Sequence, residues 1–407
     1  MDHQPTNPAE PIDDERLRAY VALIDKLLLG ARENANALLN AQRELVDEGL
    51  VEVIGRYAEC LRQYSNQEAA AFLEDCGQQI TAFLRQIADA GSGFSPSGEQ
   101  VAFLIQLLQT IAESQGDPKV VYPLLQINLA LLNSALVELL SQWWEGVLAR
   151  AQQDQKQTLA DVLVRLGICL NEFPLGSLGT NQEIAIAAYR NALRVYTEDK
   201  LPQDYALLNN NLGNAYSDLA PFSANPREQI ENGISAYRNA LRVCTEEEQP
   251  QAWAATKNGL GNAYLALAPF SGNPREQIEN AIVAYLNALQ VRTEAELPHD
   301  WAATNINLGA VYSALAPLSA NPREQIENAI AAYRNALRVY TEEEQPQDWA
   351  LTNNNLGNAF CNLAPLSPNP REQIENGIAA YRNALRVYTE EEQPQGWART
   401  NNNLGVA

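Results

Sequence analysis

Residues 321–368 read NPREQIENAIAAYRNALRVYTEEEQPQDWALTNNNLGNAFCNLAPLSP, and this stretch decides the fold. It opens with the signals of a helix start: Asn321 as the N-cap, Pro322 at the first helical position and Glu324 three residues after the cap. Apolar side chains follow at steps of four and three, which predicts one buried helical face. They are Ile326, Ile330, Tyr333, Leu337 and Tyr340. We expect this helix to end at the glutamates of residues 342–344.

A second helix is predicted to begin near Gln347. It carries Trp349, Leu356-Gly357 and Phe360, and the segment at residues 364–368, which contains two prolines, breaks it. The unit is therefore a pair of helices. One such pair cannot bury its apolar face alone, so it must stack on neighbours.

The neighbours are present in the sequence, because the same features recur at a period of 48 residues. The recurring tyrosines are Tyr189, Tyr237, Tyr285, Tyr333 and Tyr381, and the recurring leucines, each followed by glycine, are Leu212, Leu260, Leu308, Leu356 and Leu404. An earlier, degenerate copy has Leu166-Gly167 before Tyr189. A fixed period of this length indicates a solenoid. The sequence predicts an all-α fold: an α-α superhelix over residues 151–407, with a concave inner surface.

The repeat resembles the tetratricopeptide repeat (TPR). The residues that carry the resemblance are Leu212, Gly213, Tyr216, Tyr237 and Ala240, with Ile234 in a slot where the family has alanine. The standard repeat has about 34 residues, and the extra length here falls between the helices. The resemblance implies a TPR-like solenoid that binds proteins.

The chain before the repeats divides into a disordered tail at residues 1–13 and an N-terminal helical region at residues 14–150. The tail is predicted from its polar, proline-rich composition. In the helical region, Val120 to Val137 is the least charged stretch, and we interpret it as one buried amphipathic helix rather than a membrane span. Two roles remain open for this region: a cap that covers the first repeat, or a separate interaction module.

Nearly the whole chain also resembles cyanobacterial TPR proteins that often end in a CHAT domain, a caspase-like module. The resemblance rests on the segments 44–51, 116–118, 121–125 and 173–176 and on the asparagine-rich repeats. It implies a sensor or adaptor array that signals to a C-terminal effector. The CHAT catalytic pair, a His and a Cys, has no counterpart in these residues. Because the sequence stops at Ala407, inside a predicted helix, we expect a fragment of a longer protein, with the last repeat truncated.

Composition narrows the classes of molecule that this chain could bind. The formal net charge is −22, and this acidity argues against nucleic acid and anionic membrane, since phosphate binding draws on Lys and Arg. The five cysteines are scattered and odd in number, which favours a reducing cytoplasm over a disulfide framework. No Cys/His group has metal-ligand spacing and no phosphate-loop motif occurs, so no cofactor is predicted.

Asparagines line the first helix of each pair, which in TPR arrays faces inward. An amide both donates and accepts hydrogen bonds, so such a ladder could bind the backbone of an extended peptide. The predicted peptide-binding residues are Asn210, Asn211, Asn214, Asn258, Asn262, Asn307, Asn354, Asn355, Asn358 and Asn402. The alternative is structural: these amides bond one another and the helix ends between repeats.

Other candidates have plainer interpretations. Arginines recur at two positions of the second helix, the second being Arg194, Arg242, Arg338 and Arg386, and with the glutamate runs they indicate a solvated, charge-paired face rather than an acidic-ligand site. Cys244 and Cys361 replace residues of sister repeats and lack a histidine neighbour, and His299 lies in a predicted loop. The sequence therefore predicts no enzyme. It predicts a scaffold that binds a protein or peptide, or alternatively the regulatory part of a CHAT-type peptidase.

Overall fold

The computed structural model describes residues 98–407, and the predictions made for residues 1–97 lie outside the described part. The chain divides into two compact units, residues 1–191 and residues 192–407. Each unit is described by itself. Throughout residues 98–407 the regular structure is helical, and no strand occurs there. The all-α prediction is thereby confirmed for this part of the chain.

The described part of the first unit contains the α-helices α5 to α9. Their bounds are α5 Gly98–Ser114, α6 Pro118–Ile127, α7 Ser134–Arg150, α8 Gln153–Glu172 and α9 Leu178–Ala192, whose last residue belongs to the second unit. The prediction of one buried helix from Val120 to Val137 is wrong. The stretch is broken after Ile127, a short 3-10 turn (η3, Leu129–Leu131) follows, and Ile127 is 80% exposed. Asn133 ends the break because its side chain accepts from the backbone N–H groups of Ala135 and Leu136 and so caps α7.

The predicted degenerate repeat corresponds to α8 and α9. Gly167 of α8 lies against the Tyr189 ring of α9: a Cβ built on the glycine would be 2.3 Å from a ring carbon. The sister repeats have the same glycine-tyrosine contact. The boundary between the two compact units falls between Asn191 and Ala192. The domain boundary at residue 150 stays a prediction.

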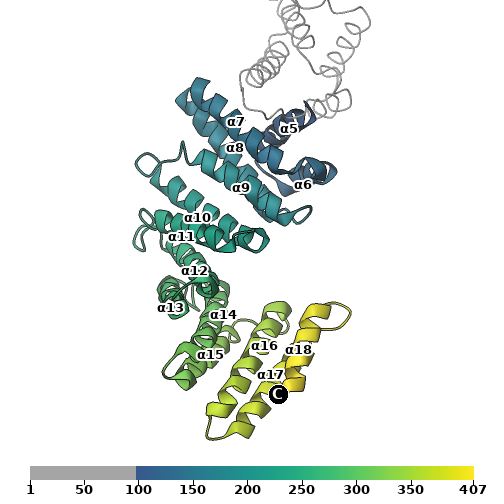
Figure 1. The fold of residues 1–407 in the computed structure, drawn as a ribbon, viewed down its shortest axis with the longest axis vertical. Coiled ribbons are helices and arrows are strands. Elements are labelled where there is room, and N and C mark those ends of the chain that lie inside the picture. Colours follow the sequence, from purple (N-terminus) through teal and green to yellow (C-terminus); the bar gives the residue numbers. More distant parts are fainter. Residues whose placement is uncertain (1–97) are drawn as a thin grey trace, which may run out of the picture. The chain divides into compact units, whose positions relative to one another are not determined.

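The second unit is the regular repeat array (Figure 1). We call the first helix of each pair the A helix and the second the B helix. The A helices are α10 Pro202–Leu219, α12 Pro250–Leu267, α14 Pro298–Leu315, α16 Pro346–Leu363 and α18 Pro394–Val406. The B helices are α11 Pro226–Ala240, α13 Pro274–Val291, α15 Pro322–Ala336 and α17 Pro370–Ala384. A 3-10 turn follows each of the first four A helices: η4 Ala220–Phe222, η5 Ala268–Phe270, η6 Ala316–Leu318 and η7 Ala364–Leu366.

Proline opens every helix of the array, because its fixed φ and missing N–H suit the first turn. The predicted asparagine cap is only partly as expected. Asn225 accepts from the Glu228 backbone N–H at 3.4 Å, a long bond, and its amide donates to the Glu228 carboxylate at 3.0 Å. At Asn321 the structure has only the second bond, to Glu324.

The B helix of residues 321–368 ends earlier than predicted. It stops at Ala336, and the apolar pattern continues to Tyr340 through a turn in which the Tyr340 N–H bonds to the Ala336 carbonyl at 3.0 Å. Tyr340 is still buried, so the pattern marked burial correctly and helix length incorrectly. His299, predicted in a loop, lies in the first turn of α14 instead.

The core of each repeat is built on a glycine of the A helix and a tyrosine of the B helix. A Cβ at Gly309 would lie 2.6 Å from the Tyr333 ring, and one at Gly261 would lie 2.7 Å from the Tyr285 ring. Only glycine lets the buried ring come this close. Around the ring pack the recurring apolar residues, such as Leu356, Ile326 and Ile330 in one cluster.

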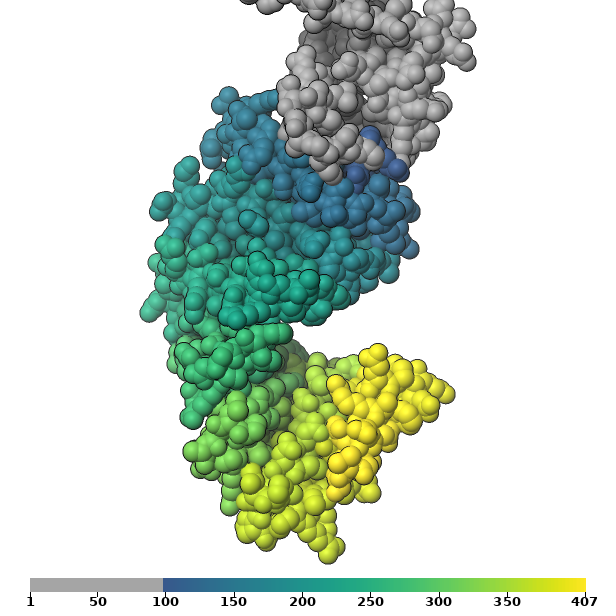
Figure 2. Space-filling view, in the orientation of Figure 1, coloured from purple at the N-terminus to yellow at the C-terminus, as the bar shows by residue number. Residues whose placement is uncertain are grey.

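Successive repeats share these clusters, so the array is continuous (Figure 2). The A helices of neighbouring repeats contact one another more than the B helices do. The inner side of a curved stack is the side where helices lie closer together, which places the A helices on the inner side of the second unit.

Tryptophans also recur every 48 residues, and they are only half-buried: Trp253, Trp301, Trp349 and Trp397. Trp301 is half-buried beside a cluster of Ala302, Ala336 and Tyr340. The guanidinium of Arg338 covers its ring at 5.6 Å from the ring centroid. A tryptophan here joins adjacent repeats at their edge and does not fill the core.

Candidate functional site

The ten predicted asparagines all lie on A helices, but their exposure differs. Asn214, Asn262 and Asn402 are exposed, and Asn354 is only 2% exposed. The other six are half-buried: Asn210, Asn211, Asn258, Asn307, Asn355 and Asn358. The ladder is therefore not one uniform row facing solvent.

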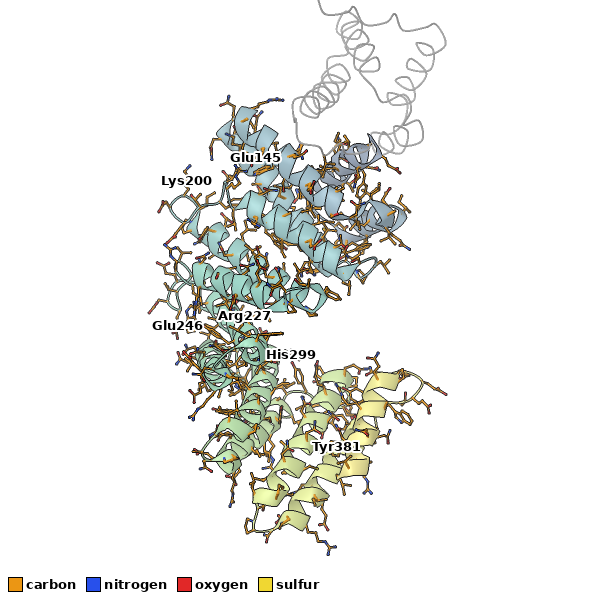
Figure 3. The ribbon with its side chains drawn as sticks, viewed as in Figure 1. Glu145, Lys200, Arg227, Glu246, His299 and Tyr381 are labelled. Atoms are coloured by element: carbon orange, nitrogen blue, oxygen red, sulfur yellow. The ribbon has the colours of Figure 1, made fainter. Side chains whose placement is uncertain are left out.

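Three of the asparagines are held by the core tyrosines. The hydroxyls of Tyr237 and Tyr285 donate to the Oδ1 atoms of Asn214 and Asn262, each at 2.6 Å, and Tyr381 (Figure 3) donates to Asn358 at 2.7 Å. Burial raises the pKa of Tyr237, so its hydroxyl stays protonated and able to donate. The bond uses the amide oxygen of each asparagine. It leaves the amide nitrogen free to donate elsewhere.

Two further pairs of asparagines bond across neighbouring repeats. The Asn307 amide donates to Asn258 Oδ1 at 3.4 Å, and the Asn403 amide donates to Asn354 Oδ1 at 3.3 Å. The Thr400 hydroxyl donates to the same oxygen of Asn354 at 3.1 Å. These contacts have the form that the structural alternative predicts. Asn354, buried and engaged by two donors, is placed where it ties two A helices together.

The tyrosine bonds occupy the oxygens of these asparagines and leave their nitrogens unused, whereas the Asn307 nitrogen donates in a cross-repeat bond. Asn214 and Asn262 are exposed, their Oδ1 atoms accept from tyrosine, and no bond from their Nδ2 atoms is formed within the described residues. Each amide thus offers two N–H donors in a fixed orientation. A row of fixed donors can bind carbonyl oxygens, which are the acceptors that an extended backbone presents.

Sequence reasoning missed a second asparagine row, three positions before four of the five recurring leucines, with Lys257 in this place before Leu260. Asn305 donates to the Trp301 carbonyl at 2.9 Å and accepts from Asn335 at 3.2 Å. Asn353 makes the same two bonds, to the Trp349 carbonyl and from Asn383. The signal was available, because an asparagine of the B helix recurs 30 residues later in both repeats. These amides are internal connections of the array.

The arginine rows have two separate roles. Three arginines bridge to a glutamate of the preceding loop: Arg242 to Glu198 at 2.9 Å, Arg338 to Glu294 at 2.6 Å and Arg386 to Glu342 at 2.7 Å. The predicted charge-paired face is confirmed for these pairs. In the other row, Arg238 lies over the Tyr264 ring, and Arg334 lies over the Phe360 ring.

Within residues 98–407, Cys169 and Cys244 are buried and Cys361 is half-buried. Burial raises the pKa of Cys169 to about 11, and it also raises that of Cys244. A thiol with a raised pKa carries little thiolate and is a weak nucleophile. The His299 ring stacks on Tyr340, with 6.2 Å between ring centroids. Within residues 98–407 no group of three or more His, Cys, Asp and Glu side chains could hold a metal ion.

No protein-family model matches the sequence, and no curated protein matches it. The fold is similar to that of a thermophilic TPR protein of Thermus thermophilus, with 17% identity and a TM-score of 0.37 over 60% of this chain and 98% of that chain. It is also similar to BtubC of P. vanneervenii, with 17% identity and a TM-score of 0.35 over 69% of this chain and 90% of that chain.

The helical-repeat fold itself is evident from the helix pairs of the second unit. The described part of the chain is accordingly an all-α array of stacked helix pairs. Among the described residues, no helix is long and apolar enough to span a membrane.

Proposed function

We propose that this scaffold binds an extended segment of a partner protein along the inner face of its A helices. The observation that supports this most is the pair of exposed donors on Asn214 and Asn262, each fixed by a tyrosine hydroxyl. Donors fixed before binding lose little conformational entropy when a partner arrives. The role extends by analogy to Asn358, which has the same bond from Tyr381.

Of the other predicted residues, Asn258, Asn307 and Asn354 support the face from within. Their cross-repeat bonds set the distance between neighbouring A helices. Apolar contacts would come from side chains beside the ladder, among which Leu207 is 55% exposed. Backbone carbonyls bind the amides whatever the partner's side chains, and side-chain selectivity comes from the apolar positions.

The test is a pair of isosteric substitutions, Asn214→Asp with Asn262→Asp. Aspartate keeps an oxygen for the tyrosine hydroxyl and removes both N–H donors. We expect peptides selected from a displayed random library on the wild-type chain to bind the double variant at least tenfold more weakly, with an unchanged melting temperature. A matched control, Asn232→Asp with Asn280→Asp, makes the same charge change on B helices and should leave binding intact.

Equal peptide affinity for wild type and the double variant would reject the inner-face proposal. Lost thermal stability with intact affinity would assign the ladder to structure alone. Both quantities can be measured on the same protein preparation.

A second candidate is compatible with the first: the regulatory part of a CHAT-type caspase-like peptidase of cyanobacterial type. It rests on the sequence resemblance alone, which implies a regulatory array in the cytoplasm. The full gene decides this candidate. A caspase-like His and Cys encoded after residue 407 would support it, and a gene without them would reject it.

A further inference from the structure

The B helix α13 differs from its sisters on its exposed face. Where α11 and α15 have Arg238 and Arg334, α13 has Leu286, which is 45% exposed. One turn before it, Val283 is 57% exposed at a position that holds Ser235 and Ala331 in those helices. Positions three apart on a helix lie on the same side, so the two side chains form one apolar strip.

The same face loses a second charge one turn further on. Gln290 stands where the sister repeats have Arg242, Arg338 and Arg386. In those repeats the arginine bonds to the first glutamate of the preceding loop, at 2.6 to 2.9 Å. The glutamate that corresponds to them here is Glu246, and its carboxylate has no such partner among the described residues.

The place of the missing guanidinium is open. A pocket of about 380 Å³ lies between the end of α13 and the loops that lead into α12 and α14. Its wall includes Glu246, Glu296 and Gln290, and Val291 and Leu297 add an apolar side. Figure 3 shows Glu246 on the same edge of the array as Lys200, which lies in the loop before α10.

The cation that directly follows α13 does not fill this place. Arg292 occupies the slot of the buried tyrosines Tyr340 and Tyr388, and its guanidinium donates to the Thr304 hydroxyl at 3.0 Å and lies 3.7 Å from the Asp300 carboxylate. Its side chain is only 12% exposed. Because it is engaged by α14, it leaves Glu246 and Glu296 at the pocket, and neither carboxylate forms an ion pair within residues 98–407.

We propose that α13 and the two loops beside it form a second docking surface, on the outer side of the array. It takes an amphipathic segment of a partner protein, with apolar side chains on Val283 and Leu286 and one arginine in the pocket between Glu246 and Glu296. The sister repeats supply the template, since in each of them an arginine guanidinium occupies the corresponding place. A guanidinium pairs with a carboxylate through parallel hydrogen bonds, which makes arginine the better fit over lysine.

Charge complementarity selects the same partner. The chain carries a formal net charge of −22, so a basic segment is attracted to it and an acidic one is repelled. The strip and the pocket lie on one helix face about 10 Å long, from a rise of 1.5 Å per residue between residues 283 and 290. A partner segment of two to three helical turns would cover it.

The test uses a displayed library of random twelve-residue peptides and two variants that restore the sister residues, Gln290→Arg and Leu286→Arg. Peptides are selected on the wild-type chain, and those that also bind the Gln290→Arg variant are removed. We expect the surviving peptides to contain an arginine and two apolar residues within two turns. The removal step already excludes peptides that bind Gln290→Arg. The affinity of the surviving peptides should also fall at least tenfold for Leu286→Arg and for Glu246→Gln.

Controls separate this surface from the inner face and from misfolding. Glu343→Gln makes the same chemical change in a sister loop and should leave affinity within twofold. The Asn214→Asp/Asn262→Asp variant should also bind these peptides normally, because it alters only the A helices. Both restoring substitutions place an arginine where the α14–α15 repeat already has one, Arg334 in α15 and Arg338 just after it, so the melting temperature should stay unchanged.

Three outcomes would overturn the proposal: no peptide survives the removal step, the survivors lack arginine, or their affinity is insensitive to Glu246→Gln.

Discussion

The α12–α13 repeat and the α14–α15 repeat have cores of the same construction but different surfaces. In both, a glycine of the A helix touches the ring of a buried tyrosine of the B helix, and a leucine and an alanine pack beside it. The α12–α13 repeat differs from its sisters at several other positions. They include Lys257, Val283, Leu286, Gln290 and Arg292, and also Gly259, which lies against the Tyr237 ring where the sisters have asparagine.

The departures change the end of the helix but not its packing. α13 runs to Val291, whereas α15 ends at Ala336, and the arginine in the tyrosine slot bonds to α14 in place of an aromatic contact. The comparison teaches that the repeat tolerates exchange wherever a side chain meets solvent or a loop. It keeps the glycine that follows the recurring leucine and lies against the buried tyrosine ring, at Gly213, Gly261, Gly309 and Gly357.

The largest effect is expected from the shared core. Leu260→Ala and Leu308→Ala should each lower the free energy of unfolding by about 2–5 kcal/mol, since both side chains are 6% exposed and their loss leaves a cavity. Trp301→Ala should cost less than Leu308→Ala, because Trp301 is half-buried. Urea unfolding followed by circular dichroism checks the order, and a Trp301 effect above that of Leu308 would show that the edge, not the core, dominates.

A smaller loss is expected at the glycines. Gly261→Ala and Gly309→Ala should each destabilise by about 1–3 kcal/mol, because the new methyl group overlaps a buried ring. Alanine is otherwise the better helix former by about 1 kcal/mol, so a net loss isolates the contact. Gly272→Ala, where a Cβ meets nothing within 4 Å, is the matched control. A gain in stability at Gly261 or Gly309 would contradict the close approach.

Raising the pH above 10 should lower the stability of both repeats. Burial raises the pKa of Tyr333 from 10.0 to about 12, a bond involving Ser313 lowering it slightly, and burial also raises the pKa of Tyr285. Above pH 10 the unfolded chain loses these protons first, so the stabilisation is complete below pH 10 and is lost as the pH rises toward 12.

Each such tyrosine then removes about 1 kcal/mol of stability per pH unit. Urea midpoints measured at pH 9 and pH 11 check this, and Tyr333→Phe should reduce the slope by one tyrosine's share. A slope that is the same in Tyr333→Phe would mean that other groups carry the titration.

The tyrosine hydroxyls distinguish the two repeats more finely. Tyr285 donates to Asn262, but in the next repeat Ala310 stands in the asparagine's place and Tyr333 has no such acceptor. Tyr285→Phe should therefore cost about 0.5–1.5 kcal/mol, the usual net value of a hydrogen bond, and Tyr333→Phe should cost less. The Ala310→Asn variant offers the missing acceptor and should bring the two repeats closer together in a thermal melt.

The smallest effect belongs to the surface ion pairs. Arg338→Gln breaks the bond to Glu294, yet both side chains are substantially exposed, so the loss should stay below about 1 kcal/mol and shrink with added salt. Gln290→Arg should gain no more than that. A change of several kcal/mol from either variant would give the ion-pair row a structural weight that its exposure does not support.

The sequence alone determined the helical repeat, its period and the identity of the core face. Those properties follow from spacing: apolar residues at steps of three and four select a helix face, and recurrence every 48 residues selects a stack. It also located the ladder of asparagines. It failed at helix ends such as Ala336, because the apolar pattern continues through a turn that buries Tyr340 without any helix.

Only the tertiary structure decided what each asparagine does. Asn214 and Asn354 look alike in the sequence, yet the first is exposed with its oxygen held by Tyr237, and the second is buried between Thr400 and Asn403. The reason is that an amide's partners come from residues 23 to 49 positions away. Their distance in space depends on how helices of different repeats pack, which no local pattern records. The open place beside Glu246 has the same origin, since it lies between the ends of helices that meet only in the folded array.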